Sequence, residues 1–506
     1  MAVRSAGIAL VGRTFSFVLS IISTMVLARL LTPRDFGIMT MVTTASLLFS
    51  SWGLNGFPEL IMQREKLTAS LASNLFWINL GVGVLLTAGF ASMGPLLGTF
   101  YHNAAVVHAT EGMSLTIVIG CLGWIHYGLL QRAMRFRAIA IIGFIATLIQ
   151  AVSAIVLAKA GWGYWALVAG SVVYYVALDA GSWWACRWVP SWPARCEGTG
   201  SGFRFAINIY SHCAFSYLTH NTDNILVGRQ FGARALGLYK KAYDLFVLAE
   251  TQLMAPISAV AVNTLSRVSN NREQFIRYFL RAISVLALLG MGIGTDFALV
   301  GNDLMRLLLG PGWEQAGRIF ALFGPGIGLM LLYDAHGWIH ISIGRPDRWL
   351  RWALLEFVCT ASLFLLALRW GPSGIAAAWT ASYFLLVFPG FWYAGKPIDL
   401  KIWAILGTVW RFFVASIAAG CGTLLIFRVM PHFELRIQFL SVLIRIISVS
   451  LVFFVLYFCG IILLHKGLKP IKEAAGLLRD LKPGSGNPPV ISISNERREA
   501  AVPACD

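Results

Sequence analysis

The sequence contains few charged residues, since Asp, Glu, Lys and Arg together make up only 12% of its 506 positions. A water-soluble globular domain carries about twice that fraction, and disordered chains are poor in apolar residues. The scarcity of charge therefore excludes both classes. Apolar residues take its place: 58% of the chain is hydrophobic, with 33 Phe and 18 Trp. The composition predicts an integral membrane protein.

Motifs for enzyme chemistry and for metal binding are also missing. The chain has no GxxxxGK[ST] loop, and GMGIG at 290–294 lies in an apolar run without the preceding strand of a dinucleotide site, so we interpret it as packing glycine. The C-x₂-C spacing of zinc sites is absent. We predict neither an enzyme nor a metal site. The net charge of +17 is attributed to basic loops at a membrane surface, and no nucleic-acid partner is expected.

Fourteen apolar runs are long enough to cross a bilayer. A helix needs about 20 mostly apolar residues for this, because each backbone N–H and C=O must find its partner inside the helix. The sequence therefore predicts an all-α membrane protein with 14 transmembrane helices. The expected spans lie near residues 9–29, 37–58, 73–97, 113–130, 139–159, 164–186, 204–227, 236–264, 279–300, 318–341, 351–368, 374–394, 403–427 and 438–464.

Most of the 40 Lys and Arg residues fall at the termini and in the even-numbered loops between these spans. Lys and Arg collect on the cytoplasmic side of membrane proteins. We therefore expect a multi-pass protein with both termini in the cytoplasm.

An internal repeat is visible at a shift of 200 residues, where 26–39 aligns with 226–239. A second match, at a shift of 210, aligns 161–170 with 371–380. Six spans separate equivalent helices, so both halves cross the membrane in the same direction and are related by an axis along its normal. The identities at the first shift are Arg29 with Arg229, Arg34 with Arg234 and Gly37 with Gly237.

The repeat predicts two pseudo-symmetric six-helix lobes and two extra helices. The tail begins with basic and aliphatic residues and continues with GSGNPP, which predicts an amphipathic segment followed by a disordered end. The expected divisions are an N-lobe at 1–190, a cytoplasmic linker at 191–203, a C-lobe at 204–395, the two extra helices at 396–465 and a cytoplasmic tail at 466–506.

A polar stripe follows one face of the expected span 204–227. Its members recur every three or four residues, which places them within one arc of a helix about 20 Å long. Such a face either lines a hydrated cavity or forms a hydrogen-bonded seam with a neighbouring helix, and its length favours the cavity. The stripe consists of Asn208, His212, Ser216, Thr219 and Asp223.

Three arginines lie in the interior of expected spans, away from the span ends. Arg13, in the first span, either faces the cavity, where its guanidinium can bind an anion through two hydrogen bonds, or extends to the membrane surface. The first and seventh spans are equivalent in the repeat, so their polar faces would oppose each other, which favours binding. Arg411 and Arg445, in the extra spans, either bind a lipid headgroup or extend to the surface.

Acidic residues within spans are candidates for ion coupling, because a charge at the bilayer centre costs about 2.5–3.5 kcal/mol on insertion scales. Asp334 lies near a span end and is expected to be satisfied locally. For the remaining carboxylates the alternative is pairing with a neighbouring Arg or His. The coupling candidates are Asp223, Glu250, Glu356 and Thr360.

Several segments resemble the bacterial polysaccharide-export branch of the multidrug/oligosaccharidyl-lipid/polysaccharide transporter superfamily, and within it the flippases for exopolysaccharide repeat units. The resemblance covers about residues 5–465. The segments that carry it are LARLLTPRDFGIM, ELIMQREKLTASLASNLFWINL, LLQRAMRFRAIA, GWGYWALVAG and NTDNILVGRQFGARALGLYKKAYDL.

The resemblance implies a bacterial inner-membrane protein that moves an undecaprenyl-diphosphate-linked oligosaccharide between leaflets by alternating access. Arg13, with Arg29 and Arg229 at the outer mouth, would bind the diphosphate. A Na⁺ or H⁺ gradient would drive transport. The partners would be the surrounding membrane lipid, a polymerase and a chain-length regulator. The alternatives are a cation-coupled multidrug exporter, which the absence of an acidic residue in the first span disfavours, and a polytopic polymerase or glycosyltransferase.

Overall fold

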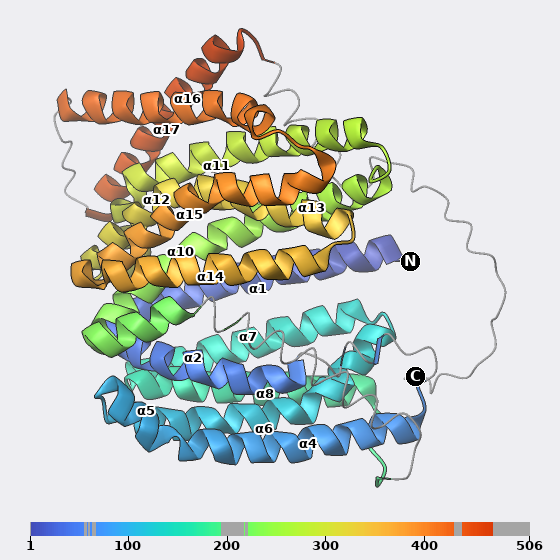
Figure 1. Cartoon of the computed structure of the whole chain (residues 1–506). Coiled ribbons are helices and arrows are strands. Elements are labelled where there is room, and N and C mark those ends of the chain that lie inside the picture. Colours follow the sequence, from blue (N-terminus) through green and yellow to red (C-terminus); the bar gives the residue numbers. More distant parts are fainter. Residues whose placement is uncertain are drawn as a thin grey trace. The chain divides into compact units, whose positions relative to one another are not determined.

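The computed structural model describes residues 2–54, 58, 61–62, 67–193, 217, 221–429 and 438–468, with only the backbone at 2–13, 51–54, 249, 255–256, 259, 346, 429 and 438. The regular elements in these ranges are helices (Figure 1). Contacts along the chain divide it into two compact units, with the boundary between Gly237 and Leu238. We call them the N-unit and the C-unit.

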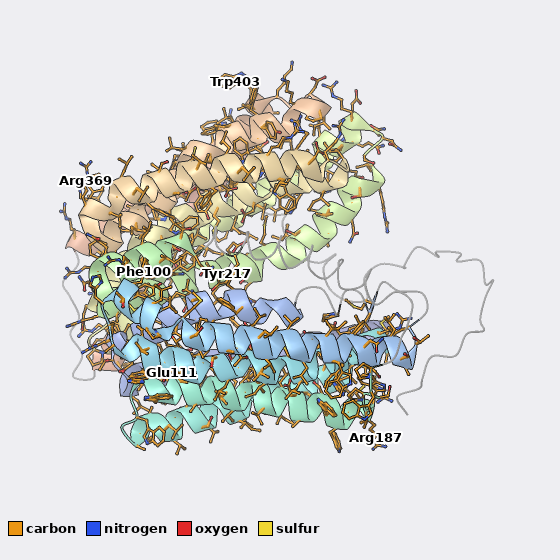
Figure 2. The ribbon with its side chains drawn as sticks, turned by 60° about the horizontal axis from the view of Figure 1, so that its bottom comes forward. Phe100, Glu111, Arg187, Tyr217, Arg369 and Trp403 are labelled. Carbon is orange, nitrogen blue, oxygen red and sulfur yellow. The ribbon has the colours of Figure 1, made fainter. Side chains whose placement is uncertain are left out.

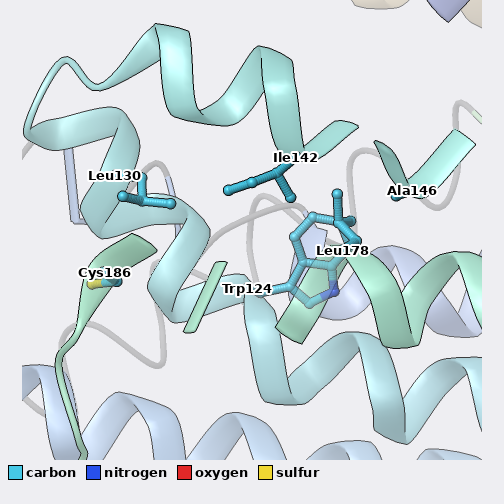
Figure 3. Packing of buried hydrophobic residues seen from close by; sticks show 6 residues of the cluster. All are labelled: Trp124, Leu130, Ile142, Ala146, Leu178 and Cys186. Carbon is cyan, nitrogen blue, oxygen red and sulfur yellow. The ribbon is translucent and has the colours of Figure 1, made fainter. Parts of the chain in front are cut away.

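The described residues of the N-unit contain seven complete helices. Within it, α6 packs against α2, α4 and α8, and α7 packs against α1 and α8. The helices are α1 (Ala2–Leu30), α2 (Pro33–Leu54), α4 (Ala69–Ser92), α5 (Gly94–Tyr101), α6 (Ala105–Arg132), α7 (Phe136–Lys159) and α8 (Tyr164–Cys186). A core cluster joins the last three helices and is drawn in Figure 3, where it consists of Trp124, Leu130, Ile142, Ala146, Leu178 and Cys186.

The C-unit is built around α11, which packs against α12, α16 and α17, while α15 packs against α12 and α14. A long helix, α10 (Thr222–Arg267), crosses the boundary between the units. The others are α11 (Arg272–Leu309), α12 (Glu314–Asp334), α13 (His336–Ser342), α14 (Pro346–Ala367), η1 (Leu368–Trp370), α15 (Gly371–Gly395), η2 (Lys396–Ile398), α16 (Ile402–Val429) and α17 (Gln438–His465).

The chain is a multi-span membrane protein. In the part of the chain that the structure describes, nine helical segments are long and apolar enough to cross a bilayer. The span expected at 164–186 coincides with α8. The segment at 94–101, expected to continue a span and then enter a loop, forms the separate short helix α5, which begins with Pro95 in its first turn.

The region around α10 differs from expectation. Two spans were predicted, at 204–227 and 236–264, with a short loop between them, and the first lies almost wholly outside the described residues. From Thr222 to Arg267 the chain is helical, and within it Gly232 adopts a non-helical conformation with φ 78° and ψ −179°. Glycine takes this φ without steric cost because it has no Cβ. The expected loop is therefore a kink at one glycine.

Glycines bring α11 and α12 into close contact, as interpreted for the GMGIG motif. A Cβ on Gly290 would lie 3.0 Å from the Cα of Gly328, and one on Gly294 would lie 2.6 Å from the carbonyl oxygen of Gly324. The helix α12 continues through Pro325. The Gly-Pro-Gly segment at 324–326 therefore contributes to close packing.

A close helix contact in the N-unit involves two glycines that the repeat aligns. A Cβ on Gly37 would lie 1.6 Å from the carbonyl oxygen of Ala233, and one on Gly237 would lie 1.8 Å from that of Pro33. A shift of 200 residues converts one contact into the other, so the pair is reciprocal, as in a two-fold symmetric interface. This reciprocity supports the internal repeat.

We expect Gly37→Ala to lower the melting temperature of the purified protein by several degrees, because the backbone of α10 would have to move and overpacking of this kind costs about 1–3 kcal/mol. Gly81→Ala is the matched control, since no atom lies within 4 Å of a Cβ at that helical position. Fluorescence-detected size exclusion after heating measures both. Equal melting temperatures for the two variants would contradict the close contact.

Candidate functional site

Most of the predicted cavity residues fall outside the described part of the chain. Arg13 lies on α1, where only the backbone is described. Four residues of the predicted polar stripe lie outside the described residues, namely Asn208, His212, Ser216 and Thr219.

Asp223, the last member of the predicted stripe, lies in the first turn of α10 and is fully buried. A carboxylate is favoured there by the positive end of the helix dipole. The side-chain amide of Asn224 donates to Asn221 Oδ1 at 3.0 Å, and the Asn221 amide donates to the carbonyl of Tyr217 at 2.9 Å. The Tyr217 hydroxyl interacts electrostatically with Asp223. Polar groups therefore gather at the start of α10, where the stripe was expected to end.

Arg229 is exposed on the next turns of α10 and contacts the segment after α5. Its Nη1 donates to Nδ1 of His102 at 2.8 Å, and its guanidinium lies 5.4 Å from the ring centre of Phe100, which Figure 2 labels. The accepting nitrogen must be unprotonated, so the imidazole is neutral. In the N-unit residues that the structure describes, no carboxylate forms an ion pair with Arg229.

An exposed guanidinium that is held by a neutral ring keeps its full charge and several N–H donors for an anion. The diphosphate-binding role that the resemblance implies for Arg229 stays a prediction, and this environment is compatible with it. Its equivalent in the repeat, Arg29, is exposed in the last turn of α1.

A network of carboxyl and aromatic hydroxyl groups lies inside the C-unit. Trp352 Nε1 on α14 donates to the hydroxyl of Tyr333 at 2.7 Å, and that hydroxyl is hydrogen-bonded to Glu356. Asp334, at the end of α12, is hydrogen-bonded to Glu250 of α10 and interacts electrostatically with Glu356. We call Glu250, Asp334 and Glu356 the carboxyl network.

The carboxyl network brings together two of the predicted coupling residues and adds a third. Asp334, expected to be satisfied locally, interacts with Glu250 and Glu356 on two other helices. Thr360 is buried one turn after Glu356, and Asp223 belongs to the N-unit. The signal for Asp334 in the sequence is an acidic residue at the end of a long apolar run, which does not reveal its partners.

Arg445 forms an ion pair inside the protein, whereas the sequence left lipid-headgroup binding and extension to the surface as its two roles. Its Nε donates to Oδ2 of Asp303 on α11 at 2.6 Å, and its Nη2 donates to Oδ1. Metal ligation gains no support, because among the described side chains no group of three His, Cys, Asp or Glu could hold a metal ion.

The fold of this chain is also found in a solved structure. The solved structure of the lipid II flippase MurJ in its inward closed conformation superposes with a TM-score of 0.71, at 13% identity, over 90% of this chain and 99% of that one. The two proteins therefore share a fold.

Curated relatives agree with the resemblance noted in the sequence. The succinoglycan biosynthesis transport protein ExoT of Rhizobium meliloti (strain 1021) is 22% identical over 357 residues, which cover 71% of this chain and 72% of the relative. The teichuronic acid biosynthesis protein TuaB of Bacillus subtilis (strain 168) is 23% identical over 398 residues, which cover 76% and 80%.

The family described as polysaccharide biosynthesis protein matches residues 26–318. This match covers more than half of the chain and includes α2 and the beginning of α10, where Arg229 and Asp223 lie. The chain therefore belongs to the polysaccharide biosynthesis protein family.

Proposed function

We propose that the chain is a flippase that moves undecaprenyl-diphosphate-linked oligosaccharide repeat units from the cytoplasmic to the periplasmic leaflet of the bacterial inner membrane, for exopolysaccharide synthesis. The observation that carries this proposal is membership of the polysaccharide biosynthesis protein family. The fold shared with MurJ supports it, because that protein is named as a flippase of a lipid. A polymerase and a chain-length regulator would act on the product.

In this proposal the chain crosses the membrane 14 times, as two six-helix lobes and two extra helices, with both termini in the cytoplasm. Apart from the span expected at 204–227, each expected span overlaps a helix of the described residues, which supports the count. The lobes would alternate between openings to the two leaflets. The sugar would pass through a hydrated interior while the prenyl chain stays in lipid.

Deletion of the gene should abolish exopolysaccharide and cause lipid-linked repeat units to accumulate in the cytoplasmic leaflet. These units should stay unlabelled by a sugar reagent applied outside spheroplasts and become labelled after the membrane is permeabilised, and complementation with the intact gene is the control. Drug sensitivity with normal polysaccharide would instead indicate the multidrug exporter. Sugar transfer by the purified protein would indicate a glycosyltransferase.

The anion-binding role is assigned to Arg229 because its guanidinium is exposed and contacts a neutral imidazole. A diphosphate carries charge on two groups, and Arg recognises such oxygens through paired N–H donors. Arg29, at the equivalent place in the repeat, would be the second cation.

We expect Arg229→Gln to reduce export about 5- to 150-fold at normal protein level, since one charge-assisted hydrogen-bonded contact contributes roughly 1–3 kcal/mol. Arg234→Gln, at another exposed arginine of α10, is the control. Export is measured as polysaccharide per cell together with immunoblots of the protein. Full export in Arg229→Gln would remove this residue from the binding site.

Coupling to a proton or Na⁺ is assigned to the carboxyl network in the C-unit. Three neighbouring carboxyl groups repel one another when ionised, and a membrane interior increases that repulsion. Binding of a proton or a cation relieves it. Because the three groups come from α10, α12 and α14, relief of the repulsion would change how these helices pack and so bias one conformation.

We expect Glu356→Gln to keep the hydrogen bond to Tyr333 but to make translocation in proteoliposomes insensitive to an imposed pH or Na⁺ gradient. Glu111→Gln, at an exposed position of α6 labelled in Figure 2, should retain the gradient dependence of the unmodified protein. Initial rates are compared with and without each gradient, which also distinguishes H⁺ from Na⁺. Unchanged gradient dependence in Glu356→Gln would exclude the assignment.

A further inference from the structure

The two extra helices, α16 and α17, carry one arginine each that the flippase proposal does not use. Arg445 of α17 is occupied by its ion pair with Asp303 of α11. The same helix is attached to α11 at two further points, since Ser450 Oγ donates to Asp296 Oδ2 at 3.1 Å and the Tyr457 hydroxyl donates to the carbonyl of Leu288 at 2.9 Å. Arg445 therefore positions α17.

Arg411 of α16 has a different environment. Its guanidinium carbon lies 5.6 Å from the ring centre of Trp410. Its Nε is buried and has no hydrogen-bond partner, and within the described residues no carboxylate forms an ion pair with it. A half-buried guanidinium without an anion is costly beside hydrocarbon. The guanidinium of Arg411 is therefore available to bind an anion from outside the described part of the chain.

Two further basic residues lie at the same end of the helix pair. His465, the last residue of α17, has its ring 4.8 Å from that of Phe412, the neighbour of Arg411, and it interacts electrostatically with Arg411. The ring nitrogen Nδ1 lies 3.1 Å from the carbonyl of Ile461 and donates to it. Nε2 is then an acceptor in the neutral ring, and it donates to a phosphate oxygen when that anion stabilises the protonated ring. Lys466 follows and is exposed.

The end of α17 does not need Arg411 as a cap. Lys466 has a left-handed conformation with φ 52°. Its N–H donates to the carbonyl of Leu463 at 3.3 Å, and the N–H of Gly467 donates to that of Ile462 at 3.1 Å. These two bonds form the Schellman arrangement that closes a helix with its own backbone. The guanidinium of Arg411 is thus not required to satisfy these carbonyl groups.

The spacing of charges places this end at a membrane surface. Residues 412–427 of α16 and 446–464 of α17 contain no charged side chain. At 1.5 Å per residue these stretches reach about 25 to 30 Å between the flanking basic residues, which matches the hydrocarbon thickness. Trp410 and Trp403, both exposed and the latter labelled in Figure 2, are typical of the headgroup level.

We propose that Arg411, His465 and Lys466 bind a phosphate group carried by a lipid. Guanidinium binds phosphate through paired hydrogen bonds, and basic pockets between membrane helices bind anionic headgroups. The lipid is either an anionic phospholipid of the bilayer or the prenyl phosphate portion of the cargo. The proposal does not rest on the flippase assignment, because it follows from the α16–α17 pair alone.

The test measures the melting temperature of the purified full chain in neutral detergent, with added phosphatidylglycerol, phosphatidylcholine or undecaprenyl phosphate. We expect phosphatidylglycerol or undecaprenyl phosphate to raise the melting temperature in a saturable manner. In Arg411→Gln the half-saturating lipid concentration should rise at least about fivefold, as expected for loss of one basic contact. Stabilisation by phosphatidylglycerol identifies a bilayer lipid, and stabilisation by undecaprenyl phosphate alone identifies the cargo.

Arg428→Gln is the matched control, because this exposed arginine lies at the opposite end of α16. It should saturate at the same lipid concentration as the unmodified protein. Arg445→Gln should lower the melting temperature at every lipid concentration without changing half-saturation. If Arg411→Gln does not fold, Lys466→Gln, at an exposed position, replaces it. Equal half-saturation in the tested variant and in Arg428→Gln, or no lipid effect on the unmodified protein, would overturn the proposal.

Discussion

The cost of an unsatisfied polar group in hydrocarbon governs this structure at every level. At the level of the backbone it leaves helices as the elements that can cross the bilayer, because each N–H and C=O must be bonded within its own segment. At the level of side chains it requires each buried charge to find a partner or a ligand. Arg445 meets this requirement with Asp303, while the carboxyl network meets it through hydrogen bonds among its members and Tyr333.

Helix packing in the membrane depends on a second consequence of the same environment. Lipid is as apolar as a helix surface, so association relies on close contact of backbones rather than on exclusion of water. The glycines of α11 and α12 provide such contact in the C-unit, and Gly37 and Gly237 provide it in the N-unit. The reciprocal arrangement of the latter pair links a packing requirement to the internal repeat.

The chemistry of the molecule follows from where charge remains after these requirements are met. Arg229 contacts a neutral imidazole and keeps its charge available at the surface of the N-unit. The carboxyl network gathers three carboxyl groups inside the C-unit, where ionising all of them together is unfavourable. Arg411 offers a guanidinium to the headgroup region at one end of α16 and α17. We propose an anionic lipid-linked cargo, a coupling cation and a lipid phosphate as the respective ligands of these three places.

The sequence by itself determined where most of the apolar helices lie and the packing role of GMGIG, because the hydrocarbon thickness and the helix period act on neighbouring residues. The internal repeat stays a prediction, which the reciprocal glycine contact supports. The sequence also identified Glu250 and Glu356 as carboxylates whose burial in the membrane costs free energy. Only the tertiary structure decided their partners. Arg445 and Asp303 are 142 residues apart, and Arg229 and His102 are 127 apart. Such pairs leave no periodic trace in a single sequence, since they depend on which helices pack together and on how each is rotated about its axis.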